Sequence, residues 1–340
     1  MIPAPVSIVH NPSVPRPFSI GRNVDPQGVP DELDPSPRRL AAARTARRRG
    51  RRFGWLLGDT IFDRIRVDTG LRFLHSVLGL EQLSYGLWED EELTLDGLRP
   101  AQDRYADHLV ELIPSDVRRV LDVGCGTGST AQRMIERGLD VEGLAPDPYL
   151  GELFPQRTRR PFHLCRFELF RPTEPFDLIF MSESAQYVML DQLFRRVMLH
   201  NPGAYLLVAD YFRIRPGGAP FGRSGHLLDE FLDEADQWQF ELLHRENITE
   251  GVAPTLELAR TLGERFVGPT VDLLDDAMVS RRPLLWKVGG PAARRMVKPW
   301  QERIRRLDAS EFVRSYRYEV FLFRAPVSMD ELWRRKRARP

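Results

Sequence analysis

The stretch VLDVGCGTG, residues Val120–Gly128, decides the fold of this chain. Its apolar first half is typical of a short buried strand of a parallel sheet, and the residues that follow have the spacing of a helix. Gly124, Gly126 and Gly128 permit a tight turn between the two elements and a close approach to a ligand, because no Cβ intervenes. The helix that opens near Ser129 presents free N–H groups to the same place. We therefore predict a ligand site between this strand and this helix.

The same strand–helix rhythm continues on both sides of the loop. Helical spacing occurs at 104–114, 129–138 and 190–199, and apolar runs typical of strands occur at 139–145, 162–169, 176–182, 204–212, 239–247 and 317–325. Strands that alternate with helices in this way predict an α/β protein. We expect a Rossmann-like, mostly parallel seven-stranded sheet with helices on both faces, N-terminal helices and a helical lid insertion.

Changes of composition along the chain predict additions to this core. Proline-rich sequence without periodic hydrophobic residues precedes an arginine-rich stretch, and a long, mostly helical pattern interrupted by prolines follows the sixth strand. The predicted organisation is a disordered or extended basic arm (1–52), a helical cap (53–100), a Rossmann-like cofactor-binding core (101–251), a helical lid insertion (252–312), the final strand of the core (313–325) and a basic tail (326–340).

Composition and charge exclude several other classes of protein. The 340 residues carry a formal net charge of +1, so the chain as a whole has no bias toward nucleic acid. The two cysteines lie in apolar runs, and no spacing indicates a metal site or a secreted disulfide framework. No apolar run is long enough for a transmembrane helix, and prolines interrupt the stretch where a signal peptide would need continuous apolar sequence. We therefore expect a cytoplasmic protein.

The arginine-rich stretch at 38–52 leaves several interpretations open. It holds eight arginines and no acidic residue, and it adjoins Phe53 and Trp55. Basic residues beside bulky apolar ones can mark peripheral membrane contact. A solvated arm, or a contact between subunits of a homodimer, also explains the pattern. We favour these last two interpretations, because the segment shows no clean basic face. We do not expect nucleic acid as a partner, because the Asn/Asp-Pro-Pro-aromatic motif found in many enzymes that modify nucleic-acid bases is absent.

The spacing of the glycines distinguishes between cofactors. Dinucleotide folds use G-x-G-x-x-G, whereas this chain has G-x-G-x-G with Asp122 two residues before the first glycine. This pattern closely resembles motif I of the class I S-adenosylmethionine-dependent methyltransferases. The resemblance implies S-adenosylmethionine as the cofactor, with the acid near its methionine amino group and the glycines beneath it. It assigns to cofactor binding Asp122, Gly124, Cys125, Gly126, Thr127 and Gly128.

Other cofactor contacts follow from the same resemblance, with one departure. The second strand of the family usually ends in an acid that holds the ribose hydroxyls, but here that position is Ala145. Asp147 is the nearest substitute, and Glu142 is the other candidate. Phe167 and Glu168 occupy the region where the family contacts adenine, and Phe167 either stacks on the base or fills the core. Ser182, at the end of the fourth strand, completes the predicted set.

Two short segments resemble the small-molecule and lipid branch of the family. Tyr85-Gly86-Leu87-Trp88 resembles the YGxW element of prenyl C-methyltransferases and relatives of cyclopropane synthases, in which the tyrosine approaches the methionine end of the cofactor. The segment 181–188, MSESAQYV, resembles the ES-containing segment of prenyl and tocopherol-type methyltransferases. The resemblance places Glu183 at the acceptor, where a carboxylate can take a proton or stabilise a cation. Plain alternatives are an aromatic packing cluster for the first segment and a helix cap for the second.

We predict Glu183, Tyr187, His226 and Tyr85 as the catalytic residues. His226 lies in a Gly-flanked loop, and Asp210 and Tyr211 at the end of the fifth strand are weaker candidates. The predicted function is methyl transfer from S-adenosylmethionine to a small, partly apolar, natural-product or lipid-like acceptor. Alkene C-methylation or cyclopropanation of a prenyl or lipid substrate is the first alternative, and a non-catalytic cofactor-binding partner subunit is the second.

Overall fold

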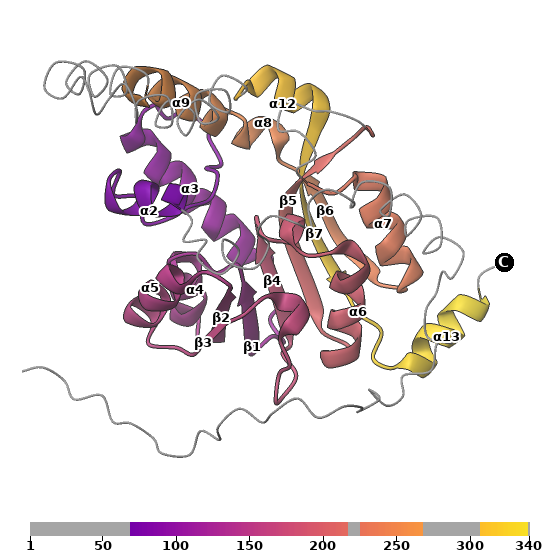
Figure 1. The fold of residues 1–340 in the computed structure, drawn as a ribbon. Helices are drawn as coiled ribbons and strands as arrows, with labels where there is room; N and C mark the ends of the chain where they lie inside the picture. The colour runs from indigo at the N-terminus through magenta and orange to yellow at the C-terminus, as the bar shows by residue number, and fades with distance from the viewer. Residues whose placement is uncertain (1–68, 217–224, 268–306, 339–340) are drawn as a thin grey trace, which may run out of the picture. The chain divides into compact units, whose positions relative to one another are not determined.

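The computed structural model describes residues 69–216, 225–267 and 307–338, and within them seven strands form one sheet (Figure 1). The strand order is β3-β2-β1-β4-β5-β7-β6, with β7 antiparallel to both of its neighbours and the other pairs parallel. This confirms the predicted fold class. The strands are β1 (Arg119–Val123), β2 (Asp140–Ala145), β3 (Phe162–Leu164), β4 (Leu178–Ser182), β5 (Tyr205–Arg213), β6 (Glu241–Asn247) and β7 (Tyr316–Arg324).

Helices cover both faces of the sheet. The helices are α2 (Thr69–Ser76), α3 (Leu95–Glu111), α4 (Ser129–Glu136), α5 (Pro148–Thr158), α6 (Leu190–His200), α7 (Leu228–Gln237), α8 (Thr249–Val252), α9 (Pro254–Leu262), α12 (Ala309–Ser315) and α13 (Met329–Ala338). Two 3₁₀ turns, η2 (Phe167–Leu169) and η3 (Ala185–Tyr187), follow β3 and β4, and a π-helical turn (Gly263–Val267) follows α9. No helix in the described ranges is both long and apolar enough to cross a bilayer.

Each face of the sheet has its own apolar core. Val120 and Phe180 pack with residues of α3, α4 and α5 on one face, whereas Leu121 and Ile179 pack with residues of α6, α7 and α13 on the other. Because neighbouring residues of a strand point to opposite faces, both must be apolar when both faces are covered. This is the physical reason that β1 and β4 are continuous apolar runs in the sequence.

The third strand is shorter than its sequence pattern predicts. β3 ends at Leu164, and the chain then turns into η2, so Phe167 and Glu168 lie on a 3₁₀ turn and not on a strand. Phe167 is buried in the α6-side core, which draws the chain out of the plane of the sheet. The run 162–169 contains apolar residues at spacings that suit either structure, and periodicity alone does not separate them.

Several of the predicted domain segments lie only partly within the described residues, or outside them. The arm at 1–52 and residues 268–306 of the predicted lid fall outside them. Within the predicted cap, α2 is followed by a stretch without helix or strand until α3 begins at Leu95, and α3 runs continuously past residue 101. The domain boundaries therefore stay predictions.

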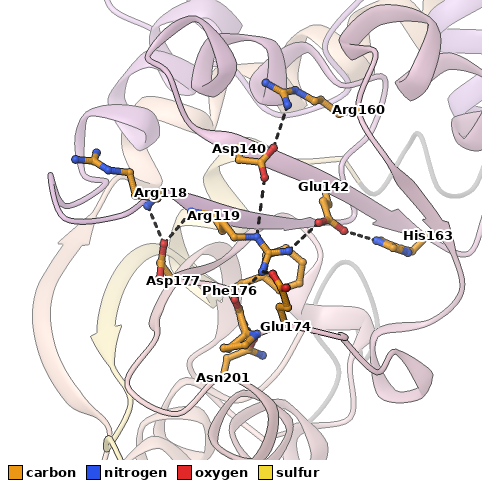
Figure 2. Close-up of polar contacts among 11 residues, drawn as sticks. Arg118, Arg119, Asp140, Glu142, Arg160, His163, Glu174, Phe176, Asp177 and Asn201 are labelled. Atoms are coloured by element: carbon orange, nitrogen blue, oxygen red, sulfur yellow. Dashed lines mark hydrogen bonds and ion pairs between the residues drawn. The ribbon is translucent and has the colours of Figure 1, made fainter.

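Polar contacts fix the amino ends of the central strands (Figure 2). The carboxylate of Asp177 accepts the backbone N–H groups of Arg118 and Arg119 at 2.9 and 2.8 Å, just before β4 begins. The guanidinium of Arg119 donates to Glu142 at 3.0 Å, and the ring of His163 lies 2.6 Å from the other oxygen of Glu142. Charge-assisted contacts of this kind set the register of β1, β2 and β3 at the edge opposite the glycine loop.

Candidate active site

The glycine loop leaves β1 at the point where the sheet reverses its strand order. β2 lies on one side of β1 and β4 on the other, and such switch points are where open α/β sheets bind ligands. Gly124, Gly126 and Gly128 have φ values of +77°, +53° and +85°, a region that favours glycine. A Cβ on Gly124 would lie 2.4 Å from the Cβ of Ser184, whereas one on Gly126 would meet no atom within 4 Å. Gly124 thus serves packing, and Gly126 leaves its backbone open to a ligand.

Asp122 provides the sharpest electrostatic feature of the cofactor side. Its side chain is buried, and its Oδ2 has no hydrogen-bond partner among the described residues. Burial raises the pKa of this carboxyl to about 7. A buried acceptor without a partner is costly, and a cationic donor would both satisfy it and favour its charged form. The ammonium group of S-adenosylmethionine is such a donor, so this observation fits the cofactor that the sequence predicts.

The segment before α3 is attached to the glycine loop. The hydroxyl of Thr127 donates to the backbone carbonyl of Glu81, whose carboxylate pairs with Arg157 on α5. Cys125 is buried, and burial raises the pKa of its thiol well above the ordinary value. Thr127 and Cys125 therefore anchor the loop through their side chains.

The two candidates for the ribose contact have different surroundings. Asp147 follows β2 and caps α5 by accepting the N–H of Tyr149 at 2.7 Å, and it is mostly buried. Glu142 is held by Arg119 and His163, at the amino end of the neighbouring strand β1 (Figure 2). Asp147 thus remains our proposed ribose contact, while Glu142 is occupied elsewhere.

The predicted adenine region is built by η2. Phe167 is buried in the core beneath it, so the core-filling alternative describes what the ring does in this structure. Glu168 accepts the backbone N–H of Met189 at 3.3 Å, which ties η2 to the segment after β4. Stacking of Phe167 on the base stays a prediction.

Glu183 lies immediately after β4 and next to the glycine loop. Its neighbour Ser184 donates to the backbone carbonyl of Val123 at 2.5 Å. Glu183 has a φ of +56°, and left-handed conformations of residues other than glycine are strained and concentrate at functional sites. Its Oε1 accepts the backbone N–H of Tyr85 at 2.7 Å and the hydroxyl of Tyr318 at 2.8 Å. Although the residue as a whole is partly exposed, burial of its carboxyl raises the pKa to about 7, against the lowering effect of these two hydrogen bonds.

Aromatic side chains surround this carboxylate. The ring of Tyr85 stacks on Phe312 with centroids 6.3 Å apart and lies 5.6 Å from the ring of Tyr318. The hydroxyl of Tyr105 lies 2.7 Å from that of Tyr318. Burial raises the pKa of Tyr85, Tyr105 and Tyr318 well above the ordinary value, so all three stay neutral near pH 7.

A third buried carboxyl lies on the neighbouring strand, β5. Asp210 on β5 is 1% exposed and accepts the N–H groups of Gln186 and Tyr211, each at 2.9 Å. Burial, with a smaller contribution from Glu183, raises the pKa of Asp210 to about 8. Two like charges so close cannot both form readily. Near neutral pH the pair therefore carries less than its full charge, which suits an apolar acceptor.

The remaining predicted residues differ in their exposure and in their contacts. Tyr187, on η3, is 79% exposed, and Ser182 contacts Tyr105 through its hydroxyl at 2.9 Å. The Nε2 of His226 lies 3.0 Å from the carbonyl of Ala185, to which it can only donate. Burial lowers the pKa of His226, which keeps the ring neutral. Glu183, Tyr85 and Ser182 thus share one hydrogen-bond network, and Tyr187 and His226 lie at its margin.

Sequence reasoning missed Tyr105 and Tyr318. Both are buried with their hydroxyls paired, in a helix and a strand that otherwise read as core. A tyrosine within a buried apolar strand needs a partner for its hydroxyl, and RYEVFLFRA carries that signal at Tyr318. The sequence does not show which residue the partner is, because Tyr318 and Glu183 come together only when β7 inserts beside β5.

Comparison with known proteins identifies the core. A family model described as a methyltransferase domain matches residues 121–207, which run from the glycine loop to β5. The chain carries a class I S-adenosylmethionine-dependent methyltransferase domain. The fold class, family and cofactor predicted from motif I are thereby confirmed for this domain.

Curated relatives match the domain over short stretches. An uncharacterised methyltransferase of Mycobacterium tuberculosis is 54% identical over 37 residues, which are 11% of this chain and 15% of that protein. The trans-aconitate 2-methyltransferase of Rhizobium etli is 36% identical over 122 residues, which are 34% of this chain and 43% of that protein. The chain thus spans less than half the length of either relative.

Solved structures share the fold over most of the chain. The [4+2]-cyclase SpnF is 22% identical with a TM-score of 0.56, and the match covers 76% of this chain and 93% of SpnF. The geranyl diphosphate C-methyltransferase of Streptomyces coelicolor, in complex with Mg²⁺, geranyl diphosphate and S-adenosylhomocysteine, is 16% identical with a TM-score of 0.53. That match covers 74% of this chain and 92% of the other. At these identities the likeness concerns the fold.

Proposed function

We propose that the protein transfers the methyl group of S-adenosylmethionine to a small, partly apolar acceptor held beside Glu183. The observation that carries this proposal is the position of Glu183. It is a carboxyl with a pKa of about 7, and its neighbour Ser184 packs directly against Gly124 of the cofactor loop. A general base works best when its pKa lies near the operating pH.

The residues divide into a cofactor side and an acceptor side. Asp122 and the glycine loop hold the cofactor, which supplies an electrophilic methyl group on a sulfonium. The acceptor atom would attack the methyl carbon in line as the carbon–sulfur bond breaks, with neutral S-adenosylhomocysteine as the leaving group. The acceptor's proton would pass to Glu183 when the nucleophile is an O–H, N–H or acidic C–H group. Apolar surroundings exclude water and favour alignment of the reacting atoms.

The aromatic side chains around Glu183 support a partly apolar acceptor and leave alkene chemistry as a specific alternative. When an alkene carbon takes the methyl group, a carbocation remains on the acceptor, and loss of a proton to Glu183 gives the methylated alkene or a cyclopropane. The rings of Tyr85 and Tyr318 lie beside Glu183, and aromatic faces attract cations. A structural neighbour binds geranyl diphosphate, which supports testing prenyl acceptors first.

A transfer assay with a deuterated methyl donor tests the proposal. The protein is incubated with S-adenosylmethionine carrying a CD₃ group and with acceptors of separate classes: geranyl diphosphate, an unsaturated fatty acid, a phenol, a carboxylate and a secondary amine. We expect mass spectrometry to show CD₃ on a partly apolar acceptor, and we expect the Glu183→Gln variant to lose about two orders of magnitude or more in rate while binding the cofactor normally.

The other outcomes of this assay also discriminate. Undiminished transfer by Glu183→Gln would remove Glu183 from the chemistry. Transfer only to the amine or the carboxylate would contradict an apolar acceptor. Cofactor binding without transfer to any acceptor, with or without added partner proteins, would favour the non-catalytic alternative.

A further inference from the structure

Buried hydroxyls connect Ser182 to Glu183 by a path through two other elements. The Oγ of Ser182 lies 2.9 Å from the hydroxyl of Tyr105 on α3, and that hydroxyl lies 2.7 Å from the hydroxyl of Tyr318 on β7. Tyr318 donates to Oε1 of Glu183 at 2.8 Å. Tyr105 and Tyr318 are almost fully buried. Because Ser182 and Glu183 are adjacent in the sequence, the contacts close a ring through α3 and β7.

The donors and acceptors give this chain of hydroxyls a direction. Each hydroxyl has one proton to donate, and that of Tyr318 goes to the carboxylate of Glu183. The proton between the two tyrosines must then come from Tyr105, and the proton between Tyr105 and Ser182 must come from Ser182. All three O–H bonds thus point toward the ionised carboxylate. Hydrogen bonds aligned head to tail polarise and strengthen one another.

The backbone around Tyr318 is itself fixed. Tyr318 pairs with Tyr211 in the β5–β7 register, and its N–H donates to the hydroxyl of Thr249 at 2.8 Å. That hydroxyl donates in turn to the side chain of Asn247 at 2.5 Å. A rigid strand therefore delivers the Tyr318 hydroxyl to a carboxylate whose own backbone is strained. Groups held by strands keep tighter geometry than groups held by loops.

We propose that Tyr318 and Tyr105 are positioning residues of the active site, which hold the Glu183 carboxylate in its left-handed backbone setting through this directed chain of hydroxyls. The assignment of Glu183 as the base rests on the proposed function. The effect of the three hydroxyls on the Glu183 carboxylate does not rest on it, because that effect can be measured with no acceptor present.

Titratable groups face Glu183 from four elements. Tyr85 comes from the segment before α3, Tyr105 from α3, Asp210 from β5 and Tyr318 from β7. Two hydrogen bonds lower the pKa of Glu183, one from the backbone N–H of Tyr85 and one from the side chain of Tyr318. Substitution of Tyr318 therefore removes the side-chain hydrogen bond and leaves the backbone one in place. Tyr187 and Tyr211 contribute to the raised pKa of Tyr85.

The test is the titration of Glu183 itself in the full chain. The protein is labelled with glutamate carrying ¹³C at the carboxyl carbon, and the Glu183 signal is the one missing from the Glu183→Gln variant. We expect Tyr318→Phe to move the midpoint of this titration upward by about one pH unit, since a hydrogen bond to a charged group is lost. Tyr105→Phe and Ser182→Ala should move it upward by less, in that order, because they act through Tyr318.

Tyr205→Phe is the matched control. Tyr205 is the first residue of β5, and its hydroxyl donates to the carboxylate of Asp116, away from Glu183. Loss of this hydroxyl should leave the Glu183 titration unchanged. An unchanged titration in both Tyr318→Phe and Tyr105→Phe would overturn the proposal, and so would a larger shift for Tyr105→Phe than for Tyr318→Phe. If Tyr318→Phe does not fold, the Tyr105→Phe and Ser182→Ala shifts decide in the same way.

This measurement separates the two proposals. The graded shifts without methyl transfer to any acceptor would sink the proposed function and leave the positioning role intact. Methyl transfer that depends on Glu183, without the graded shifts, would do the reverse.

Discussion

At the scale of single residues, the site depends on carboxyls placed where burial disfavours their charge. Asp122 and Glu183 both have a pKa of about 7, chiefly through burial, yet their partners differ. The Oδ2 of Asp122 has no partner among the described residues, whereas Glu183 is held by Tyr85 and Tyr318. The first arrangement suits binding of a cation, and the second suits exchange of a proton.

Cofactor binding should therefore release protons. Near pH 6.5 Asp122 is mostly protonated, and an ammonium group beside it favours the ionised form, so its pKa falls on binding. We expect calorimetric titration with S-adenosylhomocysteine, repeated in buffers of different ionisation heat, to show net proton release at pH 6.5. This release should shrink by pH 8.5 and disappear in Asp122→Asn. Proton uptake, or release that persists in the variant, would contradict this role of Asp122.

The backbone of Glu183 gives a second prediction at this scale. A φ of +56° is strained for any residue with a Cβ, and glycine removes that strain. We expect Glu183→Gly to be more stable than Glu183→Ala by about 1 kcal/mol in urea unfolding. Equal stabilities would mean that the left-handed conformation is relaxed away once the carboxylate is gone.

At the scale of elements, the sequence predicts what is local and misses what the sheet brings together. The glycine loop, β1, β2 and β4 follow from apolar runs and glycine spacing, because both faces of these strands are covered. The length of β3 does not follow from the apolar run, because it depends on the burial of Phe167 in the α6-side core. Glu183 could be proposed from its segment, but its partner Tyr318 lies 135 residues away and meets it only in the folded sheet. Tyr105, which contacts Tyr318 and the adjacent Ser182, is likewise 77 residues from that serine.

The glycine loop carries the prediction at this scale. Gly126 and Gly138 both have positive φ, and a Cβ on either would meet no atom within 4 Å, but Gly138 lies at the far end of α4. Each substitution to alanine should cost roughly 1 kcal/mol of stability through backbone strain. Only Gly126→Ala should also weaken cofactor binding, by about tenfold or more, since its Cβ obstructs the ligand. Equal affinities in a calorimetric titration of the two variants would place the cofactor elsewhere.

At the scale of the whole molecule, three buried carboxyls make stability depend on pH. Asp122, Glu183 and Asp210 have raised pKa values of about 7, 7 and 8. The folded state therefore holds protons that the unfolded state has already lost, and stability must fall as pH rises through these values. The lowered pKa of His226 and His200 works the other way, but that contribution is complete above their ordinary value of 6.5.

Urea unfolding between pH 7 and 8.5 isolates the carboxyls. We expect the free energy of unfolding to fall by about 2 kcal/mol over this range. Asp210→Asn should remove more than half of the decrease, because the pKa of Asp210 lies inside the interval. A stability that is constant or rises from pH 7 to 8.5 would show that these groups are ionised in the folded protein at lower pH.

The most direct test of the central claim is calorimetric titration of the full chain with S-adenosylmethionine. The wild type is compared with Asp122→Asn and with Asp191→Asn, an exposed aspartate in the first turn of α6 that serves as a matched control. We predict that the wild type and Asp191→Asn bind equally, and that Asp122→Asn binds about tenfold or more weakly, since a hydrogen bond to a charged group is lost. Equal binding by all three proteins, or none by the wild type, would contradict the assignment of this loop as the cofactor site.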